Sequence, residues 1–184
     1  RMLTPSVTEY DQVLAALTHH LVTTVGKLRK QHSYARKLFM YFATSQHADY
    51  KGAKVVRSME VRFPSPLNTV AEMLPYLTSA VKSIWPDYRS LQIKYKFSKC
   101  GVELNEITPD YAKQPCFEED VAVSRKRQNL QQAIDEINGE TPTDKRTILF
   151  GPEFAGKRKI EFVREGLSDN PTSLWEHRHK IRNE

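Results

Sequence analysis

The sequence predicts an α+β fold, a two-layer sandwich in which a small antiparallel or mixed β-sheet is covered on one face by two helices. Two observations in about the first hundred residues lead to this prediction. The elements follow the order helix, strand, strand, helix, strand, and both helices are amphipathic. Two amphipathic helices separated in this way cover only one face of a sheet, so the other face stays open. A smaller α+β extension is expected to follow.

The first predicted helix covers residues 8–31, because leucines and a valine recur at steps of three and four residues and form one apolar stripe. Thr8 followed by Asp11 resembles a capping box at its start. The second helix is expected over residues 68–85, where Met73 and Leu77 belong to a similar stripe.

Three strands are predicted from alternating apolar residues, at residues 34–44, 54–63 and 91–97. The polar stretch 46–52 joins the first two into a hairpin, and Pro64 and Pro66 are expected to end the second. A further short strand is expected at residues 1–3, cut by the start of the chain.

The predicted domain organisation has three parts. Residues 1–106 form the sheet-and-helix domain, residues 107–123 an acidic linker, and residues 124–184 a C-terminal extension with a helix at 124–138 and a short strand at 147–150. Because the chain starts at Arg1, inside what already reads as folded sequence, we expect it to be a piece of a longer protein.

Composition narrows the class of protein. The formal net charge is +6 and the sequence pI about 9.3, which favours contact with phosphate or other anionic groups. Cys100 and Cys116 are the only cysteines, so no disulfide framework is expected and a reducing cytoplasm suits the chain. No apolar run approaches the roughly 18 residues that a membrane span needs.

One stretch has the glycine and lysine spacing of a phosphate-binding loop but lacks other residues that such a loop needs. Gly151 to Lys157 has the spacing G-x4-G-K, but the next residue is Arg158, where a Ser or Thr hydroxyl would be needed to bind Mg²⁺. Pro152 also removes a backbone donor from the loop. A glycine-punctuated turn is the better interpretation.

No other catalytic or metal-binding pattern stands out. His19 and His20 are adjacent on a helix and point about 100° apart, and His177 and His179 lie in a charged tail. The predicted strands and their immediate surroundings hold no cluster of carboxylates able to hold two metal ions. We therefore expect no catalytic residue, no metal and no cofactor in this segment.

Basic residues are the stronger functional signal, because they lie on or beside the predicted strands while acidic residues there are few. They are Arg36, Lys37, Lys54, Arg57, Arg62, Lys94, Lys96 and Lys99. This pattern predicts sequence-independent contact with a DNA backbone through the open face of the sheet. Arg57 and Arg62 have opposite strand parity, so only a bulge could bring both to one face. The alternative is an ordinary solvated sheet.

Several blocks of the sequence resemble the UmuC family, the catalytic subunit of bacterial DNA polymerase V among the Y-family translesion polymerases. They are Lys27-Leu-Arg-Lys-Gln-His32-Ser-Tyr34-Ala-Arg36, Phe63-Pro-Ser-Pro66, Tyr95-Lys-Phe-Ser-Lys-Cys-Gly-Val-Glu-Leu104, Thr147-Ile-Leu-Phe-Gly151 and Asn170-Pro-Thr-Ser-Leu-Trp175. The resemblance covers essentially the whole chain.

The resemblance implies that residues 1–106 are a little-finger domain, which lays its sheet in the major groove of primer-template DNA. The Mg²⁺-dependent catalytic domains would lie upstream of this chain. The whole protein would be an error-prone polymerase of the SOS response. It would be cytoplasmic and would associate with the nucleoid when active. It also implies partners: the sliding clamp, a UmuD-like accessory subunit and RecA.

A clamp-binding peptide would correspond to Gln114-Pro-Cys-Phe117, although this stretch lacks the usual leucine and is one residue short. A polar linker with one stray aromatic is the alternative. A second hypothesis for the whole chain is a protein-interaction module that docks the clamp or a partner subunit without touching DNA. Phe39 and Tyr41 could serve either hypothesis, since an aromatic side chain can meet a base or a protein.

Overall fold

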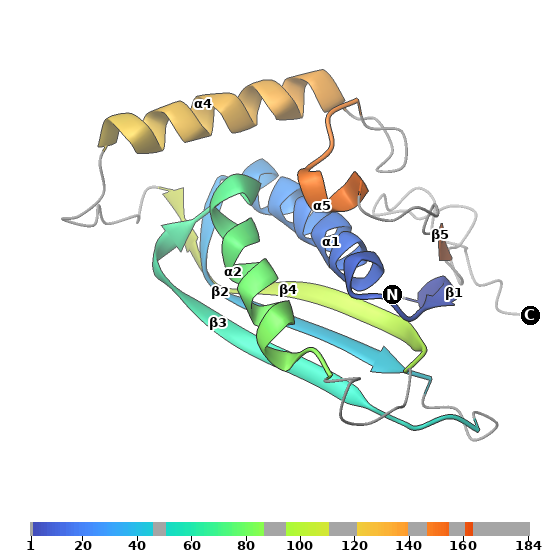
Figure 1. Ribbon diagram of the computed structural model, residues 1–184. Helices are drawn as coiled ribbons and strands as arrows, with labels where there is room; N and C mark the ends of the chain where they lie inside the picture. The colour runs from blue at the N-terminus through green and yellow to red at the C-terminus, as the bar shows by residue number, and fades with distance from the viewer. Residues whose placement is uncertain are drawn as a thin grey trace, which may run out of the picture.

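The computed structural model describes residues 2–45, 51–86, 95–110, 121–139, 147–154 and 161–163. Its sheet is antiparallel, with strand order β3-β2-β4-β1-β5 (Figure 1). The elements are β1 (Met2–Val7), α1 (Tyr10–Lys30), β2 (Ser33–Thr44), β3 (Val56–Leu67), α2 (Val70–Ile84), β4 (Phe97–Pro109), α4 (Val121–Asn138), α5 (Gly151–Phe154) and β5 (Glu161–Val163).

Helices α1 and α2 lie on the same side of the sheet, as Figure 1 shows, and the core lies between the two layers. β2 supplies Leu38, Met40 and Phe42, whose side chains are fully buried. They join the leucine stripe of α1 and the apolar side of α2, which includes Met73 and Leu77. The predicted α+β two-layer fold is therefore confirmed.

β2 is an interior strand of the sheet, because it pairs with β3 on one side and with β4 on the other. From Lys37 to Ala43 both pairings run without a break in register. Side chains on a strand alternate between the two faces. Phe39 and Tyr41 therefore lie on the face opposite the buried Met40, and both are only half-buried.

The predicted third strand is wrong in its position. β4 begins at Phe97 and continues to Pro109, whereas residues 91–94 of the prediction lie outside the described residues. The buried residues of β4 are Phe97, Cys100 and Leu104, which are spaced by three and four. The step of three results from a register shift between Phe97 and Lys99, whereas Cys100 and Leu104 lie on the same face by the ordinary alternation of a strand. The shift interrupts the alternating pattern by which a strand is recognised in sequence.

Two other strand predictions need correction. β3 does not stop at Pro64 but continues through Pro66 to Leu67. It can do so because β3 is at the sheet edge and its register with β2 shifts between Ala35 and Lys37, where prolines lose no ladder hydrogen bond. β1 is also longer than expected and ends at Val7.

The capping box predicted at Thr8 is absent. Glu9 is the N-cap of α1 and makes no side-chain capping bond, while the Thr8 hydroxyl donates to the Glu9 carboxylate at 3.1 Å. A side-chain N-cap is present instead at the start of α2, where Glu72 reaches back to the hydroxyl of Thr69 and not to its backbone N–H. There the Glu72 N–H donates to Thr69 Oγ1 at 3.4 Å, and the Thr69 hydroxyl donates to Glu72 Oε2 at 2.6 Å.

The C-terminal extension differs from its prediction in three elements: the strand at 147–150 is absent, and α5 and β5, which pairs with β1, were not predicted. The helix expected at 124–138 is present as α4, but residues 147–150 form no strand. Gly151 instead opens α5, whose start is fixed by Glu153: its carboxylate accepts the Phe150 N–H at 2.8 Å, and its own N–H donates to Phe150 O at 2.9 Å. Pro152 fits this first turn because a helix start leaves N–H groups unused. Lys157 lies outside the described residues.

Tyr41 depends on a glycine across the sheet. It pairs with Gly101 of β4, and a Cβ added to Gly101 would lie 2.7 Å from Cε1 of the Tyr41 ring. The ring therefore lies against the strand only because residue 101 has no side chain.

The two threonines give a test of the helix caps. Thr69→Ala should lower the free energy of unfolding by about 1 kcal/mol, because the Glu72 N–H loses its acceptor. Thr8→Ala should leave it nearly unchanged, since Thr8 caps no backbone group. Urea unfolding followed by circular dichroism measures both, and equal effects would contradict the assigned caps.

Replacing Gly101 and replacing Gly26 by alanine should change the free energy of unfolding in opposite directions. Gly101→Ala should destabilise the protein by about 1 kcal/mol, because the Tyr41 ring must move. Gly26→Ala should stabilise it by about 0.5–1 kcal/mol, because Gly26 is inside α1 with no atom within 4 Å of an added Cβ. The same urea titration reports both. A neutral or stabilising Gly101→Ala would show that Tyr41 does not rest on this strand.

Candidate nucleic-acid interface

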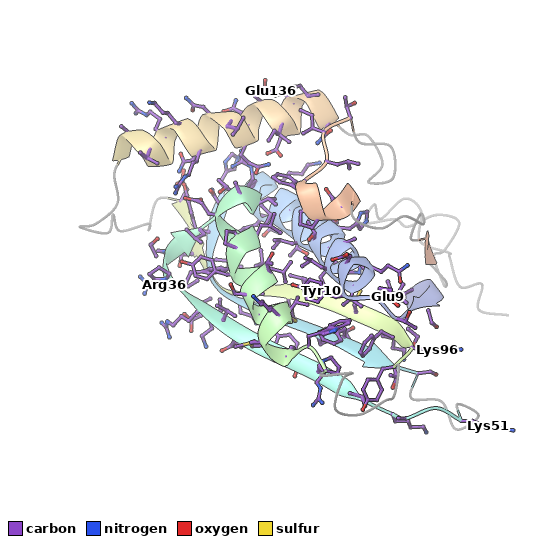
Figure 2. All side chains as sticks on the ribbon, viewed as in Figure 1. Glu9, Tyr10, Arg36, Lys51, Lys96 and Glu136 are labelled. Carbon is purple, nitrogen blue, oxygen red and sulfur yellow. The ribbon has the colours of Figure 1, made fainter. Side chains whose placement is uncertain are left out.

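Basic side chains gather at the end of the sheet where β2 leads toward β3, and we call this group the basic end. Register places them together: Ala43 pairs with Val56 and with Lys99, and the Thr44 N–H donates to Val55 O at 3.0 Å. The basic end comprises Lys51, Lys54, Arg57, Lys96 and Lys99. Figure 2 shows Lys51 and Lys96 pointing outward at this end and Arg36 at the opposite end of the sheet.

The basic end wraps around the rim of the sheet. Arg57 pairs with Phe42 and so belongs to the helix-covered side, whereas Lys99 pairs with Ala43 on the other side. Lys99 is half-buried and the other four are exposed. Within the described part of the chain, Lys51, Arg57, Lys96 and Lys99 form no ion pair. Their charge is thus available to an anionic ligand.

The opposite end of the sheet is charge-balanced. The Lys37 ammonium lies 2.9 Å from Glu60 Oε1 and 3.2 Å from Glu106 Oε1, and the Arg62 guanidinium lies 3.2 Å from Glu106 Oε2. Hydrogen bonds to Glu60 and then to Glu106 raise the pKa of Lys37 above its usual value. These acids correct the expectation that acidic residues on the sheet are few.

Glu106 reaches this group through an irregularity in β4. Its φ is +53°, and strand pairing puts it opposite Arg36, yet its carboxylate meets Lys37 and Arg62 on the other face. A residue with positive φ breaks the alternation of a strand. Sequence reasoning missed Glu106 because it ended the last strand at residue 97.

The structure divides the predicted DNA-binding residues into two groups. Lys54, Arg57, Lys96 and Lys99 come together in the basic end, while Arg36, Lys37 and Arg62 lie toward the other end of the sheet. Arg57 and Arg62 do lie on opposite faces, since no bulge separates them. Lys94 and the proposed clamp residues Gln114 and Phe117 lie outside the described residues.

One predicted residue is partly buried and one member of the basic end was missed. Arg36 is half-buried, and its Nε has no hydrogen-bond partner among the described residues. Lys51 was not predicted because it lies in the turn before β3. Its position between two predicted strands could have identified it, because a hairpin turn brings its lysines to the end of the sheet.

α4 packs on the domain through polar contacts. The Arg29 Nε lies 2.6 Å from Asp135 Oδ2, and the Val70 N–H donates to Gln131 Oε1 at 3.2 Å. Arg127 also pairs with Glu72 at 3.2 Å. These contacts face the body of the domain, so α4 is held without burying a continuous apolar side.

The apolar side of α4 faces outward. Val123, Leu130 and Ile137 recur every seven residues, and their exposed fractions are 40%, 59% and 56%. We call these three residues the outer stripe. Large apolar side chains aligned on one exposed helix face are typical of an interaction surface.

Metal and membrane features are absent from the part of the chain that the structure describes. No group of three or more His, Cys, Asp or Glu side chains there is placed to hold a metal ion. None of the helices in the same residues is both long enough and apolar enough to cross a membrane.

Comparison with known proteins gives the family. Residues 1–115 match the impB/mucB/samB family C-terminal domain. Protein ImpB of Salmonella typhimurium is 22% identical over 174 residues, and protein SamB of the same organism is 24% identical over 177 residues. Each match covers 92% of this chain but only 37% of the relative, so the chain spans little more than a third of the relatives' length. The chain therefore belongs to the impB/mucB/samB family, the UmuC-type family that its sequence blocks resemble.

Proposed function

We propose that this chain is the DNA-holding C-terminal region of an error-prone translesion DNA polymerase that acts in SOS-type damage tolerance. Family membership supports the polymerase, and the basic end supports DNA contact. In this proposal the catalytic carboxylates and their Mg²⁺ ions belong to the parent protein outside residues 1–184. The chain itself binds the primer-template duplex and holds it in place.

The observation that carries the proposal is the clustering of Lys51, Lys54, Arg57, Lys96 and Lys99 at one end of the sheet. Lysine and arginine bind phosphates without reading bases, so this contact is independent of sequence. It is also sensitive to salt, because each neutralised phosphate releases condensed cations. A polymerase that moves along its template needs a contact of this kind.

The ion-paired end of the sheet is less suited to DNA. Glu60 and Glu106 already neutralise Lys37 and Arg62, and Glu103 is exposed on β4 nearby. Phosphates brought to this end would meet carboxylates as well as cations. The structure thus favours a grip centred on the rim rather than spread over the whole open face.

Two double variants test this assignment. Lys54→Gln with Arg57→Gln should weaken binding to a short primer-template duplex roughly tenfold. The salt slope, which is the steepness with which the logarithm of the binding constant falls with the logarithm of salt concentration, should decrease by about 2 because two phosphate contacts are lost. Lys37→Gln with Arg62→Gln removes the same charge from the same strand pair and should change the slope by less than about 0.5. Fluorescence anisotropy between about 50 and 200 mM salt gives both slopes.

Three results would overturn the proposal. The protein could show no binding to duplex at low salt, or its binding could ignore salt. The control pair could also weaken binding as much as the basic-end pair, which would mean that overall charge and not this cluster holds DNA.

A second candidate function, docking of a partner protein, is favoured by the outer stripe of α4. Arg125 and Lys126 are exposed beside it, so the matching partner surface is an amphipathic helix whose apolar face has acidic neighbours. The sliding clamp, a UmuD-like subunit and RecA are the candidates that the family resemblance suggests. This function can coexist with DNA binding because α4 lies on the far side of α1 and α2 from the sheet (Figure 1).

Leu130→Lys tests this docking surface. It should weaken binding to one of these three purified partners at least tenfold, because it puts a charge in the middle of an apolar contact. Asn129→Lys adds the same charge at an exposed neighbouring position and should have little effect. Isothermal titration calorimetry measures both variants. Equal affinities of Leu130→Lys and wild type for every partner that binds would show that the outer stripe is not the contact.

A further inference from the structure

A cleft of about 350 Å³ lies along β4 beyond its pairing with β1, where the middle and second half of α1 meet the sheet edge and the side chains of Phe39 and Tyr41 reach it from the open face. Thr23, Thr24 and Lys27 line it from the helix, and Glu103 lines it from β4. The volume is at the small end of the range for ligand pockets, which begins at about 300 Å³. The cleft therefore suits a group much smaller than a duplex.

The floor of the cleft is aromatic. The rings of Phe39 and Tyr41 have centroids 6.3 Å apart and are tilted by 32°, and both side chains are half-buried. Tyr41 lies against Gly101, where any side chain would displace it. A ring supported from behind and accessible from the front is the arrangement on which proteins stack nucleobases.

The polar groups of the cleft suit a neutral ligand better than an anion. Lys27 contributes one positive charge and Glu103 one negative charge. The hydroxyls of Thr23 and Thr24 donate to helix carbonyls at 2.9 and 2.8 Å, so their hydrogens are already used within α1. The cleft offers an acceptor in the Glu103 carboxylate and donors in the Lys27 ammonium and the Tyr41 hydroxyl, which matches a planar base whose edge carries both kinds of group.

The cleft lies close to Lys99 of the basic end along β4. Tyr41 pairs with Gly101, and two residues along the same face Ala43 pairs with Lys99. Two residues of strand span about 7 Å. A DNA strand with a phosphate at Lys99 would thus have a neighbouring base within reach of the Tyr41 ring.

We propose that this cleft receives one unpaired base of a DNA strand whose backbone follows the basic end. The inference rests on the proposed function and adds a preference to it, namely duplexes that contain an extrahelical base. An unpaired base has little stacking or pairing to lose, so it enters such a cleft at the lowest cost. The competing occupant is an aromatic side chain of a partner protein.

The test compares three duplexes that differ at one position, using the whole 184-residue protein. One carries a single extra 2-aminopurine, the second an abasic residue at the same bulge, and the third is fully paired. The protein should bind the first about tenfold more tightly than the second, since stacking is sequence-tolerant but requires a base. Fluorescence of the 2-aminopurine should fall on binding as it stacks.

Variants of the aromatic floor locate the base. Phe39→Leu with Tyr41→Leu should abolish the preference, a loss of about tenfold for the base-containing bulge, while affinity for paired duplex and its salt dependence stay unchanged. Tyr41→Phe keeps the ring and should keep the preference. Circular dichroism and thermal unfolding confirm that each variant is folded.

The possible outcomes distinguish a failure of the base cleft from a failure of the proposed DNA-holding function. Salt-sensitive binding to paired duplex with equal affinity for the two bulges would overturn the base cleft and leave the DNA grip standing. Failure to bind any of the three duplexes would overturn both. A preference that survives Phe39→Leu with Tyr41→Leu would place the base elsewhere. If that variant keeps its DNA preference but loses affinity for the purified sliding clamp or UmuD-like subunit, the cleft holds a protein side chain.

Discussion

The pairing of β2 with both of its neighbours is the constraint on which the rest of the domain depends. Because β2 is hydrogen-bonded on both sides from Lys37 to Ala43, its alternation cannot slip by one residue without turning Leu38, Met40 and Phe42 out of the core. The same register puts Phe39 and Tyr41 on the opposite face. It also fixes which residues of β3 and β4 lie beside each of them.

Charge on the sheet follows from this register rather than from composition. Among the described residues at the turn end of the hairpin, none has an acidic side chain directly across the ladder, whereas Lys37 and Arg62 lie beside Glu60 and Glu106. A chain with a net charge of +6 is thus divided into one end that can attract phosphate and one that is neutralised. An aromatic cleft lies between the two.

α4 is packed the opposite way from a usual surface helix. Such helices bury their apolar stripe and expose their polar side. Here Gln131 and Asp135 face the domain while Leu130 is more than half exposed. The contacts of Asp135 with Arg29 and of Gln131 with the first turn of α2 hold the helix without using its apolar side, which leaves that side for a partner.

The sequence by itself determined α1, α2, α4, the β2–β3 hairpin and the α+β class, because each depends on a local repeat of three to four or two residues. It also named Lys54, Arg57, Lys96 and Lys99 as candidates, and their DNA contact stays a prediction. Only the tertiary structure decided that β4 runs from Phe97 to Pro109, since a register shift interrupts the alternation of its buried residues after Phe97. It alone decided which cations are neutralised: Glu106 is far from Lys37 and Arg62 in sequence and meets them through strand pairing and one positive φ. Long-range pairing of this kind leaves no periodic trace in a single sequence.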